Sequence, residues 1–213
     1  MSETTTHEKH STRSTSSRMT TRYIAITAVL AAIAFVLQYI EIPVFFMPSF
    51  IKFDFSDLPA LIGTFAYGPV CGIVIELVKN LIHATVSQSF GIGEISNFLL
   101  GAVFVGVAGL IYKNHKTRKG AIAASFIGTI AMTAASFPIN LFIVYPVYYN
   151  FMPKETIISA YQLIFSGVNS IEQCLLIFNV PFTFLKGLID VIITILIYKK
   201  ISPVLHGRKK ALG

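Results

Sequence analysis

The chain has 213 residues, of which 54% are hydrophobic and only 13% are charged, and its mean hydropathy is +0.70. These values are far from those of a soluble domain and indicate an integral membrane protein. Seventeen basic residues against ten acidic ones give a formal net charge of +7. Because the basic residues gather in short clusters rather than along one soluble face, this charge does not indicate a surface for nucleic acid.

The two ends of the chain are polar. The first twenty residues are rich in Ser and Thr and carry no signal-peptide pattern, so we expect 1–20 to be a disordered cytoplasmic tail. A membrane domain is predicted at 21–201, and 202–213 are predicted to be a basic cytoplasmic tail. The two cysteines lie in different apolar segments and provide neither a disulfide framework nor a metal-ligand spacing.

Six apolar segments follow one another along the chain, and we expect each to be a helix. They are 23–40, 58–67, 70–86, 92–112, 121–147 and 171–198. Five are long enough to cross about 30 Å of hydrocarbon at about 1.5 Å per residue. The second, 58–67, covers only about half of that thickness.

Charge decides whether the short segment counts as a crossing. Basic clusters of four, four and five residues lie before the first segment, between the fourth and fifth, and at the end of the chain. The positive-inside rule places all three in the cytoplasm. The first two share a side only if an even number of crossings separates them, so 58–67 must complete a crossing. The sequence therefore predicts an all-α membrane protein with six transmembrane helices and both termini in the cytoplasm.

The segment before the short helix, 43–57, contains two prolines and five phenylalanines, and it is not expected to be helical. Non-helical backbone at membrane depth is tolerated only where it is buried in protein or lines a cavity. We therefore expect this loop to dip from the outer face and to roof a cavity, with Ser56 or Asp57 capping the next helix. The alternative is an irregular hairpin followed by a longer helix that starts near Ile51.

Motifs for common enzymatic chemistry are absent from the sequence. There is no G-x-x-x-x-G-K-[ST] phosphate loop, so the chain cannot hydrolyse ATP by that route, and there is no H-E-x-x-H or G-x-S-x-G motif. Of the five histidines only His83 lies in an apolar segment, and we interpret it as a packed core residue. An enzyme is therefore disfavoured, and neither a metal nor a cofactor is expected.

Two lysines lie inside apolar segments, and each has a carboxylate one helical turn away. Glu76 precedes Lys79 by three residues, and Asp190 follows Lys186 by four. A charge at mid-bilayer costs about 2.5–3.5 kcal/mol on insertion scales, and pairing or a polar cavity lowers that cost. We expect Glu76 and Lys79 to form a self-contained ion pair that braces the bundle, with ligand contact as the alternative.

Other polar residues can converge on one pocket in the outer half of the membrane. Pro138 and Pro181 lie inside the last two segments, where a proline frees a carbonyl and kinks the helix. Aromatic walls with a few amide and ammonium donors are the usual composition of a small-molecule site. The alternative is that each amide binds a neighbouring helix. The candidates are Glu94, Asn97, Asn140, Tyr145, Tyr148, Asn179, Thr183 and Lys186.

The chain resembles the riboflavin-specific substrate-binding (S) components of energy-coupling factor (ECF) vitamin transporters, over about 23–200. The similarity lies in the runs FIKFDFSDLPALIGTFAYGPVCGIVIELVKNLIH, GIGEISNFLLG and PFTFLKGLID. Such S components are six-helix bundles of the bacterial cell membrane with an outer lid loop over the vitamin. They work with a membrane coupling protein and two ATPase subunits. The resemblance thus implies riboflavin as transported ligand, not as a cofactor.

The resemblance also implies roles for individual residues. Ala28 and Ala32, a pair that permits close helix approach in lipid, would meet the coupling protein. Thr183 stands where we expect Asn in this family, so the shorter reach of Thr leaves that contact open. The ligand-binding residues, including the lid, would be Phe53, Asp54, Asn97, Asn140, Tyr145, Asn179, Thr183 and Lys186.

The leading interpretation is a high-affinity riboflavin-binding subunit of an ATP-driven uptake system. An S component for FMN or another vitamin is the first alternative, because Lys52 and Lys186 would favour an added phosphate. An autonomous carrier is disfavoured, since fewer than 200 residues expected to be ordered, without an inverted repeat, leave little for alternating access. A structural subunit without a ligand would leave the converging polar residues unexplained.

Overall fold

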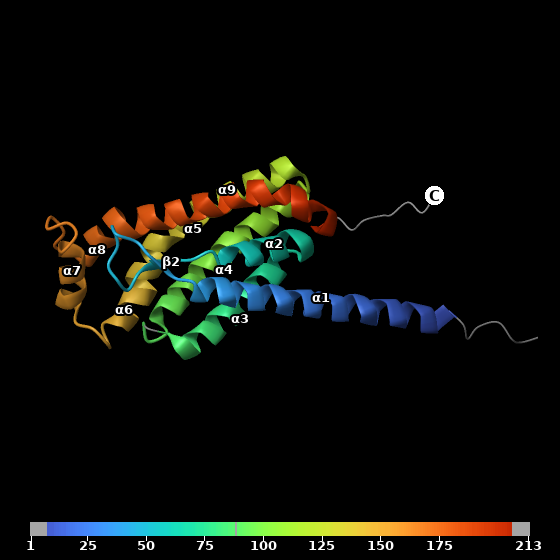
Figure 1. The fold of residues 1–213 in the computed structure, drawn as a ribbon, viewed down its shortest axis with the longest axis horizontal. Helices are drawn as coiled ribbons and strands as arrows, with labels where there is room; N and C mark the ends of the chain where they lie inside the picture. Colours follow the sequence, from blue (N-terminus) through green and yellow to red (C-terminus); the bar gives the residue numbers. More distant parts are fainter. Residues whose placement is uncertain (1–7, 88, 206–213) are drawn as a thin grey trace, which may run out of the picture.

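The structure is a computed structural model that describes residues 8–87 and 89–205, with side chains described for 21–87 and 89–197. It is a helical bundle with one short hairpin (Figure 1). The elements in chain order are α1 (Glu8–Tyr39), β1 (Ile42–Pro43), β2 (Lys52–Phe53), α2 (Asp57–Tyr67), α3 (Pro69–His83), η1 (Ala84–Val86), α4 (Ile92–Asn114), α5 (Arg118–Ile139), η2 (Asn140–Val144), α6 (Tyr145–Tyr148), α7 (Lys154–Gln162), α8 (Ile171–Cys174), η3 (Leu175–Asn179) and α9 (Val180–Leu205).

Five helical stretches in the described part of the chain are long and apolar enough to cross a membrane. They are Thr21–Tyr39, Pro69–Val86, Ile92–Asn114, Arg118–Tyr148 and Ile171–Ile197. The eleven-residue α2 is the short second helix that the sequence predicts. Figure 1 shows the start of α1 and the end of α9 at one end of the bundle, opposite α7. This arrangement agrees with an even number of membrane crossings. The short helix α2 would be the sixth crossing in addition to the five long spans.

Helix α1 begins at Glu8, within the stretch 1–20 that we expected to be a disordered tail. The structure thus differs from that prediction for 8–20, whereas 1–7 lie outside the described residues. The physical reason is that a helix already formed by an apolar span extends without a second nucleation cost. At the other end, α9 continues to Leu205, and the predicted basic tail beyond it lies outside the described residues.

Helices α2 and α3 are joined by a single residue, Gly68, whose φ of 97° is accessible chiefly to glycine. Pro69 follows as the first residue of α3, a position where its missing N–H is not needed. Further along, Gly72 lies so close to α2 that an added Cβ would be 1.8 Å from Thr64 Oγ1. Glycines therefore allow α2 to fold back tightly against α3.

Two π-helical turns interrupt the long helices: η2 lies between α5 and α6, and η3 lies between α8 and α9. The turn η2 ends two residues before Pro146, and η3 ends two residues before Pro181. A proline ring clashes with the carbonyl four residues earlier, and both of those carbonyls lie inside a π turn, which relieves the clash. Pro138 lies inside α5, as the sequence predicts. Asn140 begins one π turn and Asn179 ends the other.

The segment before α2 forms a hairpin in which β1 pairs antiparallel with β2. Helix α2 begins at Asp57, so the alternative of a longer helix from Ile51 is wrong. The expected capping is also wrong: Ser56 occupies the N-cap position, but its side chain makes no capping bond. Its Oγ instead accepts a hydrogen bond of 2.6 Å from Lys79 Nζ, because the buried ammonium needs acceptors more than the helix end does.

Candidate ligand-binding site

A cavity of about 440 Å³ lies inside the bundle, bounded by the hairpin segment and by residues of α1, α2, α3, α4, α5, η2, α6, η3 and α9. Its volume falls within the usual range of small-molecule sites, about 300–1,000 Å³. Aromatic walls are contributed by Phe50, Tyr145, Tyr148 and Phe182. Amide side chains face the cavity from four elements, at Gln38, Asn97, Asn140 and Asn179. This is the composition that the sequence predicts for the pocket.

Seven of the eight predicted ligand residues line this cavity, and one does not. Those that do are Asp54, Asn97, Asn140, Tyr145, Asn179, Thr183 and Lys186. Phe53 is buried elsewhere and packs edge-on against Phe55, with ring centroids 4.9 Å apart. Successive side chains of a strand point to opposite faces, so Lys52 and Asp54 reach the cavity while Phe53 points away.

The charges in and below the cavity form one network rather than two separate pairs. Lys186 Nζ lies 3.2 Å from Asp54 Oδ2 and 3.0 Å from Asp57 Oδ2. The other oxygen of Asp57 accepts a hydrogen bond of 2.6 Å from Lys79 Nζ, and Lys79 also contacts Glu76 at 2.8 Å. The ion pair of Glu76 and Lys79 is therefore made, but it is not self-contained. One carboxylate of α2 joins α3 to α9.

Asp54 is held in the cavity wall by three donors. Its Oδ1 accepts from the backbone N–H of Ser56 at 2.8 Å, and its Oδ2 accepts from Lys186 and from Asn97 Nδ2 at 3.3 Å. The Oδ1 atom of Asn97 is buried and has no partner among the described residues. Because a buried amide oxygen without a hydrogen bond is costly, Asn97 presents an acceptor that a ligand donor would satisfy.

The two asparagines at the π turns are anchored by the protein itself. Asn140 Nδ2 donates to the carbonyl of Ser136, and its Oδ1 accepts from Ser96 Oγ at 3.1 Å. Asn179 Oδ1 accepts 2.6 Å from Tyr161 Oη, and its Nδ2 lies 3.4 Å from the hydroxyl of Tyr145. Both side chains line the cavity and also hydrogen-bond to neighbouring elements. The two roles considered from the sequence, lining a pocket and binding a neighbouring helix, are therefore compatible for these amides.

Tyr161 comes from α7, outside the candidate membrane spans, and it was not recognised from the sequence. It is fully buried, and its hydroxyl lies 2.5 Å from that of Tyr145. Burial raises the pKa of Tyr161 well above its ordinary value, so the hydroxyl keeps its proton and donates to Asn179. This residue therefore fixes the cavity wall from behind.

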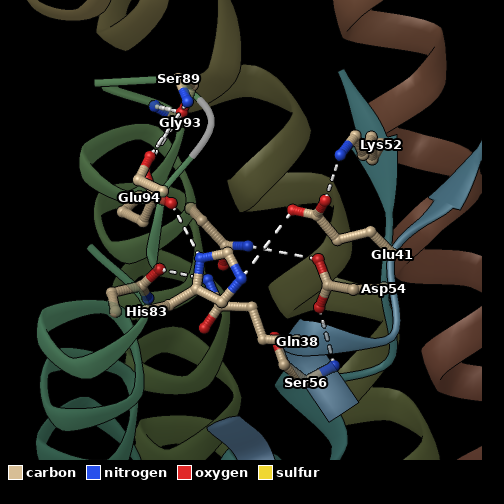
Figure 2. Close-up of polar contacts among 12 residues, drawn as sticks. Gln38, Glu41, Lys52, Asp54, Ser56, His83, Ser89, Gly93 and Glu94 are labelled. Carbon is tan, nitrogen blue, oxygen red and sulfur yellow. Dashed lines mark hydrogen bonds and ion pairs between the residues drawn. The ribbon is translucent and has the colours of Figure 1, made fainter. Parts of the chain in front are cut away.

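Figure 2 shows a second polar group at the hairpin side of the cavity. Lys52 and Glu41 form an ion pair there, and Glu41 lies 3.9 Å from His83 Nε2. His83 is buried, as the sequence suggests, and its Nδ1 lies 2.8 Å from Glu94 Oε1. Glu41, Lys52 and His83 also line a second cavity of about 420 Å³, and these three side chains therefore stand between the two spaces.

Gln38 is a further lining residue that sequence reasoning missed. It is 4% exposed, and its Nε2 donates a hydrogen bond of 2.8 Å to Asn80 Oδ1. A buried glutamine near the end of an apolar segment is itself a signal, because a lone amide in lipid has no partner. On the same helix, Ala28 and Ala32 are exposed, whereas Ala31 and Ala34 are buried against the bundle.

Residues 22–198 match the family model described as the ECF transporter, substrate-specific component. The chain belongs to this family. As an S component it is a multi-pass membrane transport protein and not an enzyme, as the sequence predicts. The matched residues coincide with the part of the chain that contains the membrane-spanning helices.

Individual relatives agree with the family. The riboflavin transporter RibU of Staphylococcus aureus is 36% identical over 182 residues, which cover 85% of this chain and 90% of that protein. The riboflavin transporter FmnP of Bacillus subtilis is 26% identical over 196 residues, with 91% and 98% covered. A solved structure of the S component of a bacterial ECF transporter superposes with a TM-score of 0.69 at 35% identity, covering 88% of this chain and 99% of the other.

Proposed function

We propose that this S component binds riboflavin in the 440 Å³ cavity with high affinity and presents it to an ATP-driven ECF transporter. Two relatives that align over most of the chain are riboflavin transporters, which supports the choice of vitamin. The observation that carries the proposal is the position of Lys186, whose side chain is 12% exposed in the wall of an aromatic cavity. Its ammonium has three N–H donors, and Asp54 and Asp57 use two of them.

The charge of the cavity favours riboflavin over FMN. Four carboxylates line the cavity, whereas Lys52 and Lys186 are its ammonium groups, and each of these lysines is already paired with a carboxylate. A phosphate would meet an excess of negative charge there, and like charges brought together discriminate against a ligand. A neutral vitamin meets no such penalty. The acidic residues are Glu41, Asp54, Asp57 and Glu94.

The binding test uses protein purified in detergent. Riboflavin fluorescence should be quenched at stoichiometric protein, and purified material should be yellow and lose its colour on denaturation. FMN added in competition should displace riboflavin only at much higher concentration. Protein that folds but leaves riboflavin fluorescence unchanged would contradict the proposed ligand, and stronger displacement by FMN than by riboflavin would contradict the charge argument.

The proposed partners are a membrane coupling protein and two ATPase subunits. The support is the exposed pair Ala28 and Ala32 on α1, since small side chains let another helix approach closely in lipid. We also propose cytoplasmic termini, on the strength of the basic clusters and of the shared end at which α1 starts and α9 finishes (Figure 1).

A further inference from the structure

Asp190, on α9, carries a fully buried carboxyl group. It is 0% exposed, and neither of its carboxyl oxygens has a hydrogen-bond partner among the residues whose side chains the structure describes. It lies on α9 one turn beyond Lys186, on the same face of the helix. The i,i+4 spacing would allow an ion pair, yet the ammonium of Lys186 lies on Asp54 and Asp57 instead.

The charges that face Asp190 come from several elements. Asp54 and Asp57 approach from the hairpin segment and α2, Lys79 from α3, and Lys186 from α9 itself. Across from α9, the neighbouring Gly187 packs on Thr129 and Met132 of α5, which do not titrate.

Both lysines of this group are already used. Lys186 contacts Asp54 and Asp57, and Lys79 contacts Asp57 and Glu76. Three carboxylates thus share two ammonium groups before Asp190 is counted.

An ionised Asp190 in this position would be a buried anion with no hydrogen bond or ion-pair contact from the side chains that the structure describes, because both nearby lysines contact other carboxylates, and such an anion is costly to bury. The same group with a proton is neutral and far cheaper to bury. We propose that Asp190 is a proton-binding site, and that its proton decides whether Lys186 stays with the cavity carboxylates or is drawn along α9. This use of the site rests on the proposed binding of riboflavin beside Lys186.

The two protonation states predict opposite positions for Lys186. With a proton on Asp190, the ammonium remains on Asp54 and Asp57, where it faces the cavity, as in the structure. When the proton leaves, a buried anion one turn away attracts the ammonium out of the cavity wall. Riboflavin affinity therefore falls as pH rises through the titration of Asp190. One linked proton gives a rise in Kd of up to about tenfold for each pH unit.

The first test compares the pH dependence of riboflavin binding in wild type and in Asp190→Asn, whose amide resembles the neutral acid. Wild-type Kd should rise from neutral to alkaline pH, whereas Kd of the variant should rise only as far as the ionisation of riboflavin itself requires. Thr194→Val, one turn further along α9 and also buried, is the matched control and should keep the wild-type profile. Equal profiles for wild type and Asp190→Asn would overturn the proposal.

The second test does not depend on riboflavin. The infrared spectrum of purified wild type should contain the carbonyl band of a protonated carboxyl that is missing from Asp190→Asn. An unchanged band overturns the proton site even if riboflavin proves not to be the ligand, whereas a lost band with no flavin binding contradicts only the proposed function. Failure of both Asp190→Asn and Asp190→Leu to fold would show that the negative charge is needed and would also overturn it.

Discussion

Replacement of Lys186 by Met tests the binding site most directly. Methionine keeps much of the length and apolar stem of lysine but removes the ammonium, so the cavity wall is preserved while the charged donor is lost. In the structure Asp54 and Asp57 take two of the three N–H donors of Lys186, which leaves one for a ligand. We therefore expect the variant to lose one charged hydrogen bond to riboflavin.

The expected loss can be stated as an affinity. A hydrogen bond to a charged group contributes about 1.5–3 kcal/mol. At about 1.4 kcal/mol for each factor of ten, this predicts a Kd that is roughly ten- to over a hundred-fold weaker. The measurement is fluorescence quenching of riboflavin by the purified variant. If Lys186→Met binds riboflavin as tightly as wild type, the assignment of the site is wrong.

Lys79→Met is the matched control for this experiment. Lys79 is fully buried and contacts Asp57 and Glu76, but it does not line the cavity. Its removal leaves two buried carboxylates short of a cation, so the main effect should be a lower thermal stability, with a smaller change in riboflavin affinity. A variant of Lys79 that binds more weakly than Lys186→Met would reverse the assignment of the two lysines.

Three further predictions concern the partner, the topology and the cavity wall. Replacing Ala28 and Ala32 together by Leu should abolish riboflavin uptake by the whole complex, while the isolated subunit still quenches riboflavin fluorescence. Loss of both uptake and quenching would show that this face of α1 supports the fold. Retention of both would show that the partner does not contact this face. In a background without the two native cysteines, an external thiol reagent should label a cysteine at Lys154 but not at Lys116, and strong labelling at Lys116 would rule out the six-span topology. Tyr161→Phe removes a buried hydroxyl that binds two partners, so the free energy of unfolding should fall by about 1–2 kcal/mol in thermal denaturation, and an unchanged stability would contradict the role of α7.

The sequence predicts most of the fold because apolar length and charge clusters report directly on membrane spans. The short helix at 58–67 was found from its length, and the structure has it as α2. Two local features of the helices could not be predicted from the sequence. The π turns before Pro146 and Pro181 depend on how a helix relieves a proline clash, and the start of α1 depends on helix extension beyond the membrane.

In the site, the residue types were predicted better than their pairings. Asn97, Asn140 and Asn179 were expected in one pocket because polar residues in apolar segments have few other uses, and all three line the cavity. The partners of Lys186 could not be predicted, because helical spacing shows only which groups can meet on one helix. The actual partners of Lys186 lie some 130 positions earlier in the chain, where only tertiary structure brings them close.

The carboxylate of Asp57 has a consequence for how the protein is made. Helices enter the membrane in the order of synthesis, so α2 and α3 arrive long before α9. Until α9 is in place, only one oxygen of Asp57 has an ammonium partner, Lys79. The second oxygen gains its partner, Lys186, with the last span. A truncated chain without α9 would leave that buried carboxylate with one of its two ammonium partners, which is costly at a buried site. The ion pairs of Asp57 are therefore complete only when the last membrane helix is present.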